Sequence, residues 1–239
     1  MSLSKLNLNN RKLWAIIPAA GSGRRFSKSE LKQYQIIQDK TVLEHTVERI
    51  TQLPLSGYVL AISESDNFAK TIDFPHADLL HFCLGGQERV DSVLNGLIYL
   101  SEIADPDDFV FVHDAARPCV NRNNLESLVQ HAVEKQVSCI LATPVRDTLK
   151  QVIIEDHIDR TVDRNFLWQA QTPQISTISK LKSAIENALL NKVNITDEAS
   201  ALEFSGESVD VVLGRSDNIK ITYPEDLALA QLIIQSQIE

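Results

Sequence analysis

The feature that most constrains the fold of this chain is a regular alternation of short apolar runs with amphipathic segments. The apolar runs stand at residues 13–18, 57–63, 79–84, 109–113, 138–142 and 208–213. Runs of this length are typical of strands that are buried on both faces of a sheet. The alternation therefore predicts an α/β fold with a mostly parallel central sheet flanked by helices. In such sheets, ligands bind beyond the carboxyl ends of the strands.

The amphipathic segments between these runs predict the helices. Thr41 and Glu44 form the pattern of a capping box, so we expect a helix to begin there. Apolar residues repeat at helical spacing over 90–98 and 125–133. Pro224 is placed to open a last helix, because proline is well tolerated in a first turn.

The stretch 145–172 lacks this helical periodicity. It carries three short β-prone pieces, at 148–154, 157–162 and 167–172. We interpret the stretch as a protruding β-arm, of the kind that exchanges between subunits and completes a composite site. A plain surface insertion is the alternative interpretation.

The composition argues against several classes of protein. A net charge of −9 over 239 residues disfavours nucleic acid and anionic membranes as partners. Three widely spaced cysteines without a C-x-x-C pair indicate neither a disulfide framework nor a zinc site. No apolar stretch approaches the roughly 20 residues that span a bilayer, and the N-terminus lacks an apolar signal core. We expect a cytoplasmic protein with a flexible leader at 1–12 and a single domain at 13–239.

A glycine turn follows the first apolar run. Residues 18–25 read Pro-Ala-Ala-Gly-Ser-Gly-Arg-Arg, and Lys32 comes seven residues after Arg25. Small residues let backbone N–H groups approach phosphate oxygens, so the turn predicts a polyphosphate site. It is not a Walker A loop, because Ser22 replaces the first glycine, nor a dinucleotide fingerprint, because Phe26 replaces the third. An ordinary strand-to-helix turn is the alternative.

A second glycine turn reads Gly-Gly-Gln-Glu-Arg at residues 85–89 and precedes a predicted helix. A helix N-terminus with exposed glycine backbone suits an anion or the polar edge of a base. A simple helix-entry turn explains the same residues equally well.

A carboxylate follows the apolar run that ends at His113. Mg²⁺ takes only one or two protein carboxylates beside phosphates and water, so Asp114 suits it. Arg117 could clamp a second anion. Adjacent strand residues point to opposite faces, so we favour a packed or hydrogen-bonded His113 over a His–Asp catalytic pair. Asp217 is either a second magnesium ligand or part of a turn.

The motifs together resemble those of the 2-C-methyl-D-erythritol 4-phosphate cytidylyltransferases of the non-mevalonate isoprenoid pathway. They recur in the family's order over nearly the whole chain. The segments are 18–25, 32–34, 85–89, 113–118, 144–148, 161–168, 172–174, 196–202 and 217–226. Leu31 departs from the family, which commonly has proline there. Gln87 stands where an acid often follows the glycine pair.

The resemblance implies a Rossmann-like nucleotidyltransferase fold and a homodimer clasped by exchanged arms. It implies transfer of CMP from CTP to methylerythritol phosphate, with Mg²⁺ as cofactor and pyrophosphate as second product. The implied catalytic residues are Arg25, Lys32, Arg164 and Lys220, and the implied metal ligand is Asp114. The implied CTP contacts are Pro18, Ala19, Ala20, Gly21, Gly23, Gly86, Gln87, Arg89, Ser92 and Ala115. The implied sugar-phosphate contacts are Asp114, Arg117, Thr148, Arg164, Thr196 and Lys220, with Thr148 and Arg164 reaching across from the partner's arm.

Other functions remain open on the sequence. A sister cytidylyltransferase acting on ribitol 5-phosphate would share the loop and the metal acid, and would differ in the arm and around Thr196. A catalytically silent nucleotide-binding or scaffold protein is disfavoured, because Arg25, Lys32, Asp114 and Lys220 are all present. A hydrolase that uses His113 fits less well.

Overall fold

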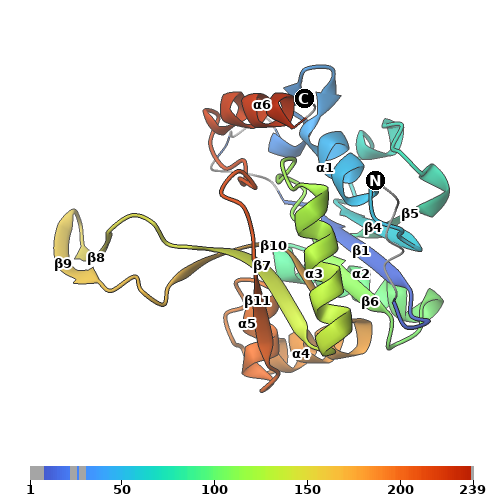
Figure 1. The fold of residues 1–239 in the computed structure, drawn as a ribbon. Helices are drawn as coiled ribbons and strands as arrows, with labels where there is room; N and C mark the ends of the chain where they lie inside the picture. The colour runs from blue at the N-terminus through green and yellow to red at the C-terminus, as the bar shows by residue number, and fades with distance from the viewer. Residues whose placement is uncertain (1–7, 22–25, 27–30, 238–239) are drawn as a thin grey trace.

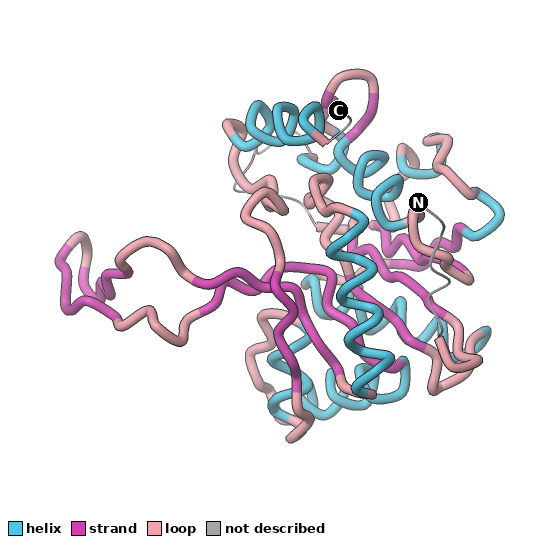
Figure 2. The backbone as a smooth tube through the Cα atoms, in the orientation of Figure 1, coloured by secondary structure: helices cyan, strands magenta, loops and turns pink. Residues whose placement is uncertain are grey.

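The computed structural model describes residues 8–21, 26 and 31–237 (Figure 1). Seven strands form the central sheet in the order β11-β7-β10-β6-β1-β4-β5, with helices on both faces (Figures 1 and 2). Neighbouring strands are parallel, except that β10 runs antiparallel to both β6 and β7. The predicted Rossmann-like α/β fold is therefore confirmed.

The predicted strands and helices occur close to their expected positions. The strands of the sheet are β1 (Leu13–Pro18), β4 (Gly57–Ile62), β5 (Leu80–Leu84), β6 (Phe109–Val112), β7 (Ser138–Pro144), β10 (Trp168–Thr177) and β11 (Val209–Leu213). The helices are α1 (Val42–Ile50), α2 (Arg89–Ile103), α3 (Arg122–Lys135), α4 (Ile178–Leu190), α5 (Glu198–Phe204) and α6 (Asp226–Ser236). Short elements are β2 (Ile36–Ile37), β3 (Lys40–Thr41) and the 3₁₀ turns η1 (Lys32–Tyr34), η2 (Ala69–Thr71) and η3 (Ala77–Leu79).

Alternation along β1 divides the core into two layers. Ala15 and Ile17 pack on the face covered by α1 and α3. Trp14 and Ile16 point to the other face, against α2 and α4. Because successive side chains of a strand point to opposite faces, a wholly apolar strand requires helices on both. This explains why the apolar run at 13–18 lies at the centre of the sheet.

The carboxyl ends of β1, β4, β5 and β6 meet at one edge of the sheet, because these strands are parallel. There the loops after β1 and β5 touch. A Cβ atom on Gly85 would lie 2.3 Å from the Cβ of Ala20 and 2.9 Å from the Oγ of Ser92. Glycine is therefore required at position 85 by close approach. The turns at 18–21 and 85–89 consequently face one another.

The arm consists of β8 (Leu149–Ile154) and β9 (His157–Val162), which pair with each other and extend away from the domain (Figures 1 and 2). The third β-prone piece predicted for the arm, 167–172, is different. It belongs mostly to β10, which returns into the central sheet between β7 and β6. Because β10 is antiparallel, it enters directly from the arm, without a crossover helix.

Both ends of the chain differ from the sequence-based expectation. α6 begins at Asp226 rather than at Pro224, because the Asp226 carboxylate accepts the N–H groups of Thr222 and Tyr223 in a preceding turn. The described part of the predicted leader, residues 8–12, is packed on the domain. Leu8 contacts the core and the backbone N–H of residue 12 donates to Asp108. No described helix has the length and apolar character needed to cross a membrane.

Candidate active site

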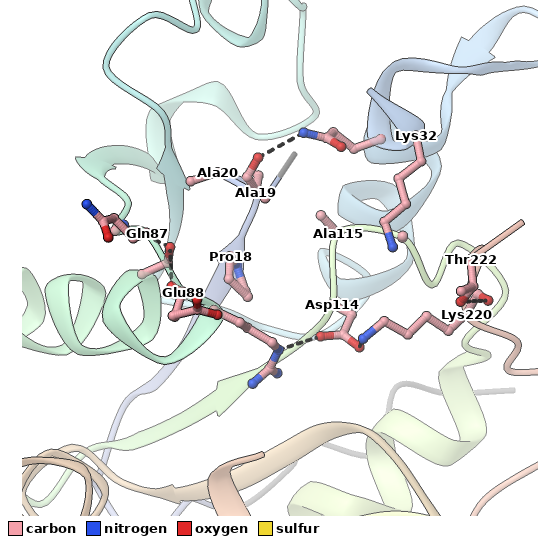
Figure 3. Close-up of a pocket in the computed structure, with 16 residues that line it drawn as sticks. Pro18, Ala19, Ala20, Lys32, Gln87, Glu88, Asp114, Ala115, Lys220 and Thr222 are labelled. Carbon is pink, nitrogen blue, oxygen red and sulfur yellow. Dashed lines mark hydrogen bonds and ion pairs between the residues drawn. The ribbon is translucent and has the colours of Figure 1, made fainter. Parts of the chain in front are cut away.

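A cleft of about 790 Å³ opens at the carboxyl edge of the sheet (Figure 3). Its walls come from the turns after β1 and β5, from η1, from the loop after β6 and from the segment before α6. It brings together twelve of the predicted site residues: Pro18, Ala19, Ala20, Gly21, Lys32, Gly86, Gln87, Arg89, Ser92, Asp114, Ala115 and Lys220. Segments from both halves of the chain thus form one site.

The remaining predicted residues lie elsewhere. Gly23 and Arg25 fall outside the described residues. Thr148 and Arg164 are exposed at the base of the arm, where Arg164 donates to the carbonyl of Arg146. Thr196 lines an adjacent hollow of about 340 Å³ that shares Glu88 and Arg89 with the cleft.

Asp114 is the electrostatic centre of the cleft. Its Oδ1 accepts from Arg89 Nε at 2.8 Å, and its Oδ2 lies 2.8 Å from Lys220 Nζ and 3.4 Å from Arg117 Nε. Burial opposes ionisation of this carboxyl most strongly, but the charges of Arg89, Lys220 and Arg117 together hold its pKa well below the ordinary value. Asp114 is therefore an anion throughout the neutral range.

Glu198 is a buried partner of Arg89 to which sequence reasoning gave no role. It lies at the start of α5, is 3% exposed, and accepts from two nitrogens of Arg89 at 2.6 and 3.0 Å. Arg89, which lines the cleft, thus bridges two carboxylates. In the sequence, Glu198 follows Thr196-Asp197 and reads only as a normal acidic first-turn residue.

His113 is fully buried behind the cleft and is hydrogen-bonded on both ring nitrogens. Its Nε2 lies 3.0 Å from the Arg117 carbonyl, which can only accept, so Nε2 carries the proton. Its Nδ1 then accepts from the Thr172 hydroxyl, whose oxygen accepts the Asp114 backbone N–H. This agrees with the prediction of a hydrogen-bonded histidine and leaves no ring nitrogen for a hydrolytic role.

The same network fixes the backbone beneath Asp114. Thr172 precedes Pro173 in a cis peptide bond, and its carbonyl accepts from the side chain of Asn218. Arg117, predicted to contact the sugar phosphate, donates to the Asn218 carbonyl at 2.7 Å as well as to Asp114. Arg117 is therefore part of the wall that holds Asp114, and it does not line the cleft.

The two glycine turns are shaped by local hydrogen bonds. Ser92 Oγ accepts the backbone N–H of Gly86 at 3.0 Å, so this hydroxyl orders the turn as well as facing the cleft. The backbone N–H of Ala19 donates to the carbonyl of Ala61 and continues the sheet pairing. Any backbone N–H cradle for phosphate must therefore begin after Ala19.

Lys32 lies in η1, across the cleft from the second glycine turn. Its Nζ donates to the carbonyl of Ile221 at 3.0 Å. Gln33, which the sequence did not single out, donates to the carbonyl of Ala19 at 2.9 Å and ties η1 to the first turn. Leu31 has φ −83° and ψ 121°, a conformation close to that of proline. The family's proline therefore fits here without changing the position of Lys32.

Asp217 is not placed beside Asp114 in the cleft lining. Its carboxylate accepts from the guanidinium of Arg215 in three contacts of 2.7 to 3.0 Å. An ion pair between residues only two positions apart is typical of a turn, so this structure favours the interpretation of Asp217 as a turn residue. Within the described residues, no group of three or more His, Cys, Asp or Glu side chains forms a metal site. Of the two acids predicted as magnesium ligands, Asp114 is the one that lines the cleft.

Comparisons with known proteins point to one family. Residues 13–236 match the family described as IspD, 2-C-methyl-D-erythritol 4-phosphate cytidylyltransferase. The chain is 68% identical over 226 residues to the enzyme of that name from Acinetobacter baumannii strain AYE, covering 95% of each chain. It is 45% identical over 227 residues to that from Vibrio vulnificus strain YJ016, covering 94% of this chain and 95% of the other. The crystal structure of the Francisella tularensis enzyme is 34% identical, with a TM-score of 0.81, covering 93% of this chain and 99% of that one.

Proposed function

Since this chain belongs to the 2-C-methyl-D-erythritol 4-phosphate cytidylyltransferase family, we infer that its cleft transfers the cytidylyl group of CTP to 2-C-methyl-D-erythritol 4-phosphate. The products are 4-diphosphocytidyl-2-C-methyl-D-erythritol and pyrophosphate, in the non-mevalonate route to isoprenoid precursors. One observation supports assigning this reaction to the cleft. Asp114 is surrounded by cationic side chains at the sheet edge where the two glycine turns meet.

The chemistry explains why the cleft is built from cations and not from a general base. An oxygen of the sugar phosphate, already ionised at neutral pH, attacks the α-phosphorus of CTP. The bond from that phosphorus to the bridging oxygen breaks, and pyrophosphate leaves with the electron pair. Two polyanions must meet while charge develops on the α-phosphoryl oxygens. Positioning and fixed positive charge therefore supply most of the rate enhancement.

We assign this stabilisation to Lys32 and Arg25, with Lys220 on the sugar-phosphate side. Lys32 and Lys220 line the cleft and lie near each other at the segment before α6 (Figure 3). The turns at 18–21 and 85–89 form the CTP side, with Gly86, Gln87 and Ser92 toward the base. Removing one preorganised donor typically costs on the order of 10²–10³ in turnover, which is our expectation for Lys32→Ala.

We propose Mg²⁺ as the divalent cation, held by Asp114. A single carboxylate completed by phosphates and water is the usual protein environment of Mg²⁺, and carboxylate oxygens retain additional lone pairs beside their ion pairs. Asp114 faces the cleft and is ionised, so the residues present fit this role. The ion would supply charge neutralisation for the triphosphate. Asp217 is left out of this site, since its carboxylate is paired with Arg215.

We propose that two subunits share each site through their arms. Thr148 and Arg164 flank the β8–β9 ribbon in the sequence and are not part of the lining of the cleft of their own subunit; they would contact the sugar phosphate in the partner's cleft. Thr196 and Lys220 would contact it from the subunit that holds the cleft. The exposed apolar side chains of the arm, such as Ile154 and Ile158, support an interface there. We expect the dimer to act in the cytoplasm, in keeping with its free cysteines.

Purified protein with CTP and Mg²⁺ tests the substrate assignment when each sugar phosphate is supplied separately and pyrophosphate is measured. We expect release with 2-C-methyl-D-erythritol 4-phosphate and none with ribitol 5-phosphate. The reverse pattern would overturn the assignment.

Co-expression of two inactive chains tests the shared site. One chain carries Lys32→Ala and the other Arg164→Ala. If arms cross between subunits, random assortment gives mixed dimers with one intact site each, and about a quarter of wild-type activity returns. If each arm serves its own subunit, every site keeps one lesion and no activity returns. Separately purified and mixed chains, held under conditions without subunit exchange, are the control.

A further inference from the structure

We propose that Glu198 is a positioning residue for this reaction, which acts by holding Arg89 against one oxygen of Asp114 and so leaving the second oxygen to Lys220 and the substrates. The proposal rests on the proposed function, because it concerns the same cleft. Nothing in the sequence pattern assigned a role to Glu198. The structure does, through a contact between residues that are 109 positions apart.

The first support is the geometry of Arg89. Its Nη1 and Nη2 donate to the two oxygens of Glu198, at 2.6 and 3.0 Å, and its Nε donates to Asp114 at 2.8 Å. A guanidinium bound at two nitrogens by one carboxylate has its plane and its direction fixed. Arg89 is thereby held with its Nε on Oδ1 of Asp114, while Lys220 and Arg117 contact Oδ2.

The second support is the rigid mounting of Glu198 itself. The preceding residue, Asp197, caps α5 by accepting the N–H of Ser200. Gln174, a buried residue of β10, accepts the N–H of Ala199 and donates to Asp197. The turn that carries Glu198 is therefore fastened to the central sheet on both sides. The sheet therefore fixes the position of the Glu198 side chain, and Glu198 in turn fixes the position of Arg89.

The third support is the local balance of charge. Arg89, Arg117 and Lys220 surround Asp114, and Glu198 is the second anion of the cluster. Without the charge of Glu198, Arg89 would turn its two-nitrogen edge onto Asp114 and occupy both oxygens. The cleft would also gain one net positive charge. Asp114 would then be withdrawn from the reaction, while attraction for the triphosphate would rise or stay the same.

Glu198→Gln tests this with a signature that a general loss of structure would not give. We expect kcat to fall about 10- to 100-fold, because a misplaced reacting group is costly, while KM for CTP stays unchanged or falls. Glu203→Gln is the matched control, since Glu203 is exposed on the same helix and the charge change is equal. We expect its kcat and KM to remain within about twofold of wild type.

A double-mutant cycle shows whether Glu198 acts through Arg89. In an Arg89→Met background, Glu198→Gln should lower kcat little further, because the group that it positions is gone. Full additivity of the two changes would overturn the proposal, as would a Glu198→Gln variant with a raised KM and normal kcat. Glu198→Asp keeps the charge but shortens the reach, so the same fall in kcat is expected if Glu198→Gln is too unstable to assay.

The outcomes separate this inference from the proposed function. An inactive wild-type protein would contradict the cytidylyl transfer itself. An active wild type with an equally active, folded Glu198→Gln variant would contradict only the role given to Glu198. Circular dichroism and urea unfolding of each variant establish that the chains compared are folded.

Discussion

The cleft and the arm differ in whether their side chains find partners within the same subunit. In the cleft, Asp114 and Glu198 are buried and their charges are met by cations of the same subunit. On the arm, apolar side chains are exposed, with Ile154 at 71% and Ile153 at 64%. A two-stranded ribbon is marginal in water by itself, and clustered exposed apolar residues mark contact surfaces. Within one subunit, therefore, the buried charges of the cleft are neutralised, whereas the apolar side chains of the arm are left uncovered.

The cationic residues of the two regions differ in the same way, in whether they pair with an anion of their own subunit. Lys220 reaches Asp114 within the subunit. Arg164, in contrast, is exposed and donates a hydrogen bond to the nearby backbone carbonyl of Arg146. A backbone carbonyl leaves the charge of this guanidinium unneutralised, so an anion from outside the subunit can pair with it. This contrast leads to predictions that treat the two regions separately.

The largest expected effect is on assembly, from charges placed on the arm. Val152 and Ile158 are opposite each other in the β8–β9 pair, so their side chains share a face. The double change Val152→Glu and Ile158→Glu should weaken the dimer at least about 100-fold, since burial of each side chain contributes roughly 1.5–3 kcal/mol. Sedimentation velocity over a range of concentrations measures this change.

The subunit itself should remain folded in that variant, because the arm lies outside the two main core layers. His157→Glu adds a charge to the same ribbon at an exposed polar position and is the control. A double variant that dimerises as tightly as the control would contradict the interface on this face of the arm.

The next effect is on stability in acid and belongs to the cleft. Burial lowers the pKa of His113 to about 4, opposed by Asp114 and assisted by Arg117 and Arg89. Below the ordinary histidine pKa of about 6.5, the unfolded chain binds a proton that the folded chain does not. The free energy of unfolding should therefore fall as the pH drops from about 6.5 to 4, by up to about 3 kcal/mol.

His113→Gln isolates this contribution, because glutamine can donate to the Arg117 carbonyl and accept from Thr172 without titrating. Urea unfolding of both proteins at several pH values gives the difference. Parallel pH profiles for the two would mean that His113 is not held neutral in the folded protein.

The smallest expected effect compares two glycines that line the same edge of the sheet. Gly85→Ala should lower the free energy of unfolding by about 1–3 kcal/mol, because the new Cβ would meet Ala20 at 2.3 Å. A Cβ on Gly21 would meet none of the described residues within 4 Å, so Gly21→Ala should change stability by no more than about 0.5 kcal/mol. Equal stabilities would show that the turns separate to admit a methyl group.

Much of the fold was predictable because its signals are local. The capping box of Thr41 and Glu44 forms as expected, with both hydrogen bonds present. The run at 13–18 is β1 with the predicted bounds. The entry of β10 into the sheet was missed, because a β-prone piece does not reveal its partner. Pairing depends on the neighbours that the sheet provides, and here these are β6 and β7.

In the candidate site, too, some features were predictable from the sequence and others were not. Asp114, Lys32 and the glycine turns were predicted from residue type and strand ends, and Lys220 from the family resemblance. The structure brings all of them into one cleft. Arg89, predicted as a CTP contact, lines the cleft but is also held between Asp114 and Glu198, and its contact with CTP stays a prediction. Arg25, predicted to be catalytic, lies outside the described residues and stays a prediction.

By itself, the sequence determined the alternating α/β architecture, the two glycine turns and the acid at a strand end, since each depends on residues within a few positions of one another. Only the tertiary structure decided which charges share a site. Glu198, Arg89, Asp114 and Lys220 come from four separate segments and meet because the sheet and the mounting of α5 place them there. Electrostatic pairing acts through space, so its partners are set by packing and not by distance along the chain.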